Sequence, residues 1–222
     1  NMERFLPPYF AALGQRMSCF VDSDQLVKAL LASTRVMMQN EDPAVTNQQA
    51  LEADFLPRLG YPESEVRPVI HAFYEDDFPA LRRYTHCRAE ARALVQTIHE
   101  QGYDMVIATN PLFPARAIEH RLNWAGVLDY PYKLVTTYEN SHFCKPNPRY
   151  YKEILDKVDC TPSQAVMVGD DFGNDIEPAT FVGLHTYWIT DNAGDGVFSY
   201  AGLQGTLADC LAWVQSGGVR EL

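Results

Sequence analysis

The chain has 222 residues, of which 46% are hydrophobic and 21% charged, an ordinary composition for a globular protein of one or two domains. Its formal net charge of −11, without any cluster of four or more basic residues, argues against binding to nucleic acid or to an anionic membrane. Five scattered cysteines without C-x-x-C spacing favour reduced thiols and a cytoplasmic location, and no apolar run approaches the roughly 18 residues of a membrane span.

Residues 1–82 predict a small, all-helical domain. Apolar residues recur there at spacings of three and four, and Asp22 or Ser23 is suited to cap a helix that extends to Met38. No segment of this region shows the alternating pattern of a strand. Two further helices, separated by Gly60-Tyr61-Pro62, are expected over residues 48–59 and 63–74.

Residues 83–222 show a different pattern, in which short apolar strands alternate with helices. The expected strands cover residues 104–109, 132–136, 165–168 and 186–189, and the expected helices cover residues 89–100, 114–124, 148–158, 176–181 and 207–214. This alternation predicts an α/β fold with a Rossmann-like parallel sheet covered by helices on both faces. In such sheets, ligands gather at the carboxyl ends of the strands.

Two groups of polar residues fall at or behind such strand ends. Thr109 and Asn110 follow the first strand, where a hydroxyl, an amide and the backbone N–H groups of the turn can hold a phosphate. Lys145 lies between an apolar Phe-Cys pair and a proline-fixed turn, which holds its ammonium near one spot, suited to a phosphate or a carboxylate. Taken singly, the first group also fits a structural turn and the second a surface charge.

The third group is an acidic loop. The apolar strand that ends at Gly169 runs directly into three carboxylates, those of Asp170, Asp171 and Asp175. Because no lysine or arginine lies nearby in sequence, these carboxylates repel one another unless a cation is bound, and hard ions such as Mg²⁺ prefer oxygen ligands. The alternative interpretation is a solvated acidic turn.

The order of the three groups (Thr-Asn, Lys-Pro, then Gly-Asp-x-x-x-Asn-Asp) resembles the haloacid dehalogenase (HAD) superfamily of phosphohydrolases, over about residues 84–190. The resemblance implies a Rossmann-like core at residues 83–222 with an inserted helical cap at residues 1–82. It implies catalytic roles for Thr109, which with Asn110 would bind the phosphoryl group, and for Lys145, which would offset charge on the nucleophile and the phosphate. It also implies Mg²⁺ at the acidic pair Asp170 and Asp175, with Asp170 favoured as the direct ligand and Asp171 as the alternative.

The superfamily's first motif, a strand followed by D-x-D that carries the nucleophile and the general acid/base, is not recognisable in the chain. Asp22 and Asp24 are the nearest candidate, but their apolar lead-in is short and Leu26 stands where a small hydroxyl residue or Val is expected. We therefore interpret them as a helix cap. Because the first-motif strand lies in the middle of the sheet, its loss would expose two interior edges. We expect about 10 to 15 further residues upstream of Asn1, carrying that strand and the nucleophile.

The implied reaction is magnesium-dependent hydrolysis of a small phosphorylated metabolite through an aspartyl-phosphate intermediate. Two alternatives stay open: a metal-independent 2-haloacid dehalogenase on the same fold, and a non-catalytic binding protein. The acidic loop favours the phosphatase over the dehalogenase, and the joint presence of Thr109, Lys145 and Asp170 argues against a pure binding module. Neither the substrate nor the oligomeric state follows from the sequence.

Overall fold

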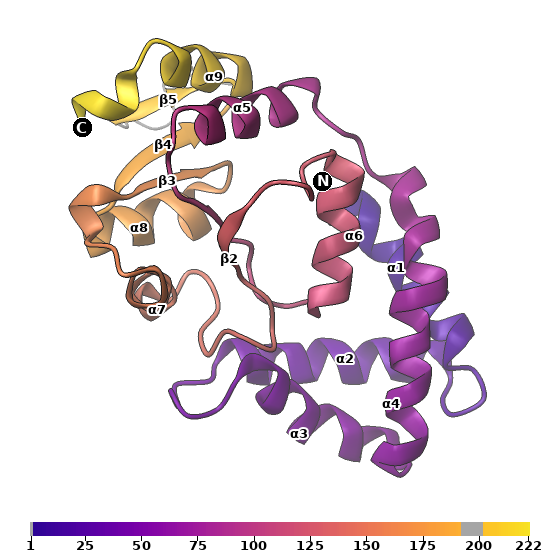
Figure 1. Cartoon of the computed structure of the whole chain (residues 1–222). Coiled ribbons are helices and arrows are strands. Elements are labelled where there is room, and N and C mark those ends of the chain that lie inside the picture. The colour runs from indigo at the N-terminus through magenta and orange to yellow at the C-terminus, as the bar shows by residue number, and fades with distance from the viewer. Residues whose placement is uncertain (1, 192–201) are drawn as a thin grey trace. The chain divides into compact units, whose positions relative to one another are not determined.

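The computed structural model describes residues 2–191 and 202–222, and the chain divides into two compact units (Figure 1). The first, here called the helical unit, comprises Asn1–Cys87, Asn110–Leu128 and Thr137–Cys144. The second, here called the sheet unit, comprises Arg88–Thr109, Asp129–Thr136 and Lys145–Leu222. The predicted domains, residues 1–82 and 83–222, divide the chain at one point. Each compact unit instead consists of three separate segments of the chain, so the predicted boundary stays a prediction.

The helical unit confirms the helical character predicted for the first 82 residues. Asp22 accepts a hydrogen bond from the backbone N–H of Asp24 at 2.9 Å and caps the second helix, which confirms the helix-cap interpretation of this pair. The elements are α1 (Met2–Arg16), α2 (Ser23–Met38), α3 (Asn47–Leu59), α4 (Glu63–Ala72), the π-helical turn η1 (Phe73–Asp77), the 3-10 helix η2 (Phe78–Tyr84) and α6 (Ala115–Ala125).

Packed rings and one buried amide hold the helical unit together. Phe73 and Phe78 are fully buried, and the ring of Phe78 stacks on Trp124 of α6 with centroids 5.4 Å apart. Asn47, also fully buried, donates side-chain hydrogen bonds to the carbonyls of Pro111 and Phe143 at 3.3 and 3.4 Å. These bonds attach two later segments of the chain to the start of α3.

The sheet unit confirms the predicted α/β class with parallel strands. Its helices are α5 (Ala89–Glu100), α7 (Pro148–Val158), α8 (Glu177–Val182) and α9 (Leu207–Gln215), with the short turns η3 (Pro162–Gln164), η4 (Phe172–Ile176) and η5 (Gly218–Glu221). Its strands are β1 (Met105–Ile107), β2 (Tyr132–Val135), β3 (Val166–Gly169), β4 (His185–Ile189) and β5 (Leu203–Gly205). Strand β5 was not predicted, because Leu-Gln-Gly contains no apolar run.

Helices cover both faces of β4, the middle strand of the order β3-β4-β5. On one face, Tyr187 packs against Leu94 of α5 and against Cys210 and Val214 of α9; Figure 1 shows α5 beside α9 there. On the other face, Thr186 lies 3.3 Å from the hydroxyl of Thr180 on α8. Successive residues of β4 therefore point to opposite faces of the sheet, each covered by a helix.

The parallel strands form two separate sheets in the described part of the chain. β1 pairs with β2, and β3 pairs with β4, so β1 and β3 both lie at sheet edges. These are the two strands that precede Thr109 and Asp170. The sequence predicts a further strand between them, and that strand stays a prediction.

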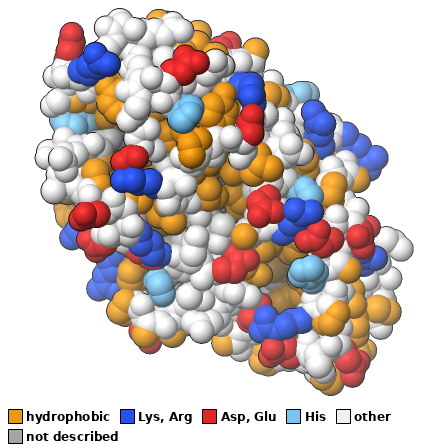
Figure 2. All heavy atoms as spheres, in the orientation of Figure 1, with side chains coloured by type: hydrophobic (Ala, Val, Ile, Leu, Met, Phe, Trp, Pro, Cys, Tyr) orange, Lys and Arg blue, Asp and Glu red, His pale blue; other side chains and the backbone are white. Residues whose placement is uncertain are grey.

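The surface carries mixed charge. Figure 2 shows blue basic and red acidic side chains interspersed over the visible face. Within residues 2–191 and 202–222, no helix combines the length and the apolar character needed to cross a membrane.

Candidate active site

The acidic loop follows β3 directly and closes on itself through Asp171. Its carboxylate accepts hydrogen bonds from the backbone N–H of Asn174 at 3.0 Å and from the Asn174 side-chain amide at 2.7 Å. These hydrogen bonds hold the pKa of Asp171 below its usual value. Both carboxylate oxygens of Asp171 are thus engaged in capping the turn η4.

Asp175 points inward and forms a buried ion pair with Lys145. The two atoms Lys145 Nζ and Asp175 Oδ1 are 2.6 Å apart, and the exposed fractions of the two residues are 5% and 7%. The second oxygen, Oδ2, accepts a hydrogen bond from the backbone N–H of Asp171 at 3.1 Å. Lys145 therefore contacts the acidic loop, as the sequence predicts for a shared site. Both carboxylate oxygens of Asp175 already have partners, one in Lys145 and the other in the backbone N–H of Asp171.

Asp170 differs from its two neighbours. It is exposed, and the structure gives its carboxylate neither a hydrogen bond nor an ion pair within residues 2–191 and 202–222. Its backbone carbonyl accepts a hydrogen bond from the indole N–H of Trp188 at 3.3 Å, which fixes the main chain at this point. Of the three predicted metal residues, Asp170 thus presents a carboxylate that is both anchored and available.

The available donors at this loop are oxygens, which is the chemistry that a hard divalent cation requires. Across the described residues no group of three or more His, Cys, Asp or Glu side chains is placed to hold a metal ion, so the loop supplies single ligands rather than a closed cage. Mg²⁺ accepts such a site, because it is commonly held by one or two carboxylates together with waters and substrate oxygens. The residues fit the predicted ion through Asp170.

Thr109 lies two residues beyond β1, with its backbone held by two hydroxyl groups. Its carbonyl accepts hydrogen bonds from Thr136 Oγ1 and from the Tyr150 hydroxyl, both at 2.8 Å. Thr136 follows β2, and its N–H donates to the carbonyl of Ile107 at 3.0 Å, which extends the parallel pairing. Asn110, the next residue along the chain, belongs to the helical unit, and its place in the site stays a prediction.

Two adjacent tyrosines of α7, which the sequence did not single out, connect these groups. The Tyr150 hydroxyl bonds to Thr109, and Lys145 Nζ lies 5.6 Å from the centre of the Tyr150 ring. The Tyr151 hydroxyl donates to the carbonyl of Asn174, and burial together with the charges of Asp175 and Asp171 raises its pKa, which keeps it a donor. Thr109, Lys145 and the acidic loop are therefore parts of one network of hydrogen bonds, an ion pair and a cation–ring contact, here called the contact network.

Gly169 allows Asp175 to approach the strand end. A Cβ atom at position 169 would lie 2.4 Å from both Cβ and Oδ2 of Asp175, and Asp175 cannot retreat without leaving Lys145. We expect Gly169→Ala to lower the free energy of unfolding by about 1–3 kcal/mol, the cost of overpacking a tight site.

Chemical unfolding measured by fluorescence would test this expectation, with Gly173→Ala as the matched control. At position 173 the nearest atom to an added Cβ is Asp171 Oδ1 at 3.8 Å, an ordinary contact. Equal stability of the two variants would contradict the close approach at Gly169.

A family model described as haloacid dehalogenase-like hydrolase matches residues 21–183. Among curated proteins, the chain is 36% identical to a ribulose-1,5-bisphosphate 5-phosphatase from Halopiger xanaduensis, over 44% of this chain and 39% of that protein. It is 29% identical to a phosphoglycolate phosphatase from Aliivibrio fischeri, over 48% of this chain and 45% of that protein. The matched part thus spans less than half the length of these two relatives.

Solved structures give a likeness of fold. A HAD phosphatase from Thermococcus onnurineus has a TM-score of 0.52 at 20% identity, covering 87% of this chain and 92% of that one. A 2-haloacid dehalogenase from Pseudomonas syringae has a TM-score of 0.53 at 19% identity, covering 96% and 81%. Because proteins named for both activities share the fold, the fold does not distinguish between them.

Proposed function

The chain belongs to the haloacid dehalogenase-like hydrolases, and from this premise we propose that it hydrolyses the phosphate monoester of a small metabolite with the aid of Mg²⁺. The observation that carries the proposal is the contact network behind β1 and β3, which joins Thr109, Lys145 and Asp175 and leaves the Asp170 carboxylate available. The curated relatives described above are named as phosphatases of small phosphorylated molecules.

Each residue of the network has a part in this proposal. Asp170 would hold Mg²⁺, which when bound supplies positive charge to screen the phosphoryl oxygens. The Thr109 hydroxyl would donate a hydrogen bond to a phosphoryl oxygen. The backbone of Thr109 is held by two hydrogen bonds, whereas its hydroxyl has no hydrogen bond within residues 2–191 and 202–222. The Lys145 ammonium would stabilise charge that develops on the phosphoryl oxygens, and Asp175 holds it in place for that task.

Asp171 and Asp175 would support the site without binding the ion directly. Asp171 shapes the loop through Asn174, and Asp175 uses one oxygen for Lys145 and the other for the loop backbone. The nucleophilic aspartate that the resemblance implies stays a prediction.

Metal removal tests the proposal. Phosphate release from a panel of sugar phosphates, phosphoglycolate and nucleotides would be measured with Mg²⁺ and again with EDTA. We expect turnover of at least one small phosphate monoester, its loss in EDTA, and its recovery when excess Mg²⁺ is added.

Release of halide from a 2-haloacid that persists in EDTA would instead identify a metal-independent dehalogenase. Absence of turnover on every phosphate and haloacid would favour a non-catalytic protein. Either result would overturn the proposal.

A further inference from the structure

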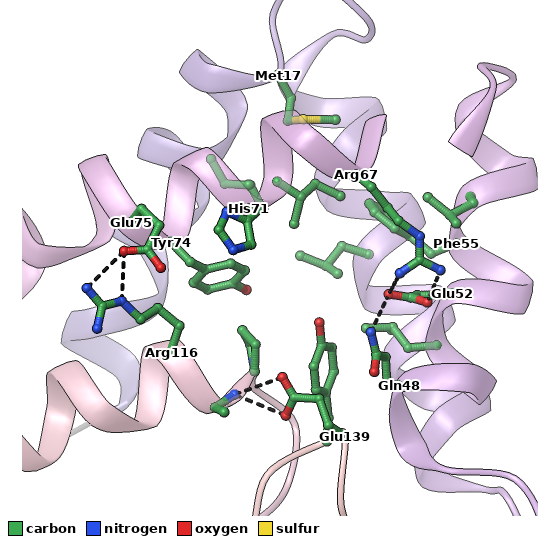
Figure 3. A pocket seen from close by; sticks show the side chains of 18 of the residues that line it. Met17, Gln48, Glu52, Phe55, Arg67, His71, Tyr74, Glu75, Arg116 and Glu139 are labelled. Atoms are coloured by element: carbon green, nitrogen blue, oxygen red, sulfur yellow. Dashed lines mark hydrogen bonds and ion pairs between the residues drawn. The ribbon is translucent and has the colours of Figure 1, made fainter. Parts of the chain in front are cut away.

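The helical unit encloses a cavity of about 580 Å³, and every residue that lines it belongs to that unit (Figure 3). The walls come from helices α1 to α4, the turn η1, the first residues of α6, and Tyr138 and Glu139 of the segment that follows β2. This volume lies in the usual range of sites for small organic molecules.

Many of the side chains that line the cavity are apolar. Met17 lines the cavity and is fully buried, and Phe55 lines it beside Arg67 and Glu52 (Figure 3). The further apolar lining includes Leu13, Leu26, Leu51 and Leu56. A ligand in contact with these side chains must present an apolar or aromatic body to them, because they offer it no hydrogen bond.

The two arginines of the lining are already paired with carboxylates. Arg67 contacts Glu52 through two nitrogens, at 2.8 and 2.5 Å, and also contacts Glu63 at 2.6 Å. On the opposite side in Figure 3, Arg116 contacts Glu75 at 2.8 Å. Neither guanidinium therefore offers its full charge to an incoming anion.

Arg116 also has a second carboxylate partner, Glu119, at 3.0 Å. The lining thus holds four glutamates against two arginines, a formal charge of −2 when His71 is neutral. This excess of carboxylates makes the cavity unsuited to a phosphate or carboxylate ligand.

Glu139 is the lining carboxylate without an arginine partner among the described residues. Both of its oxygens lie 3.0 Å from the backbone N–H of Ala115, at the start of α6, and it has no Lys or Arg partner among the described residues. It lies across the cavity from His71 and Tyr74 in Figure 3. Burial raises the pKa of Tyr138, and the negative charge of Glu139 adds to the rise.

We propose that this cavity binds an organic monocation, with an apolar or aromatic body against the leucine-rich wall and an ammonium group beside Glu139. The aromatic faces of Tyr74 and Tyr138 would add to the attraction for the cation. The N-terminus of α6, which would otherwise attract an anion, is occupied by Glu139. This inference goes beyond the proposed phosphatase activity and does not rest on it.

A series of probes that share one body and differ in charge tests the proposal. Phenylbutylamine, phenylbutanol and phenylbutyrate would be titrated into the full chain by calorimetry. We expect the amine to bind about tenfold more tightly than the alcohol, because one partly screened ion pair contributes a gain in affinity of this size. The carboxylate should bind more weakly than both. The methyl resonance of Met17 should shift on binding, and that of Met105 in the sheet unit should not.

Glu139→Gln keeps an acceptor for the Ala115 N–H and removes the charge. We expect it to reduce the amine's advantage over the alcohol to within about twofold. Glu65→Gln, the same charge change at an exposed position of α4 outside the lining, should leave all three affinities unchanged. The proposal is overturned if the carboxylate binds as tightly as the amine, if Glu139→Gln leaves the amine's advantage intact, or if no probe moves Met17 at millimolar concentration.

Discussion

Replacing Lys145 with methionine should lower the free energy of unfolding by about 3–5 kcal/mol, because it leaves a carboxylate buried without its counter-charge. The side chains of Lys145 and Asp175 are only 6% and 10% exposed, so water cannot take over the role of the missing ammonium. Methionine fills a similar volume, so the loss would report charge rather than packing. Chemical unfolding of the two proteins under identical conditions gives the difference.

The partner variant and a surface pair make this prediction specific. Asp175→Asn alone should also destabilise, and the double variant Lys145→Met with Asp175→Asn should lose less than the sum of the two, since neither charge is then left unpaired. Lys133→Met breaks the exposed pair of Lys133 with Asp104, 2.6 Å apart, and should change stability little. Equal effects at positions 133 and 145 would show that the buried pair does not carry the stability assigned to it.

The parts of the site that the sequence predicted are those marked by strand ends. Thr109 and Asp170 follow apolar strands, whose carboxyl ends are where polar ligand-binding residues gather, and Lys145 lies between an apolar pair and a proline-fixed turn. The network among them was not predictable. Tyr150 and Tyr151 stand in an amphipathic helix, where two aromatic residues ordinarily signify core packing, and nothing in the sequence shows that their hydroxyls reach Thr109 and Asn174.

The different tasks of the three carboxylates also depend on geometry that spacing does not reveal. Asp171 caps η4 because a π-helical turn begins at Phe172, and Asp175 turns inward because Gly169 leaves room for it. In a regular α-helix, which has fewer residues per turn than a π-helix, the side chains of this loop would point in other directions. Strand β5 was not predicted for a similar reason. It is a strand because it pairs with β4, and its own sequence has no apolar pattern.

Replacing Asp170 should strongly reduce the proposed phosphatase activity. If this carboxylate holds the ion, Asp170→Asn should reduce magnesium-dependent phosphate release by more than the roughly 10–100-fold that is usual for residues which only support a metal ligand. The fold should be unaffected, since the structure gives the Asp170 carboxylate no partner within the described residues. Rates measured over a range of Mg²⁺ concentrations would separate weaker metal binding, which excess ion rescues, from loss of the reaction itself.

Asp171→Asn decides between the two neighbouring candidates. Asparagine keeps an oxygen to accept the hydrogen bond from the Asn174 N–H, so the turn should persist and most activity should remain if Asp171 only shapes the loop. If Asp171 is the direct ligand instead, this variant should lose activity and Asp170→Asn should retain it. Asp156→Asn, an exposed carboxylate of α7, controls for the change in net charge. Full activity in both loop variants would show that the acidic loop takes no part in the reaction, and it would contradict the proposed role of Mg²⁺.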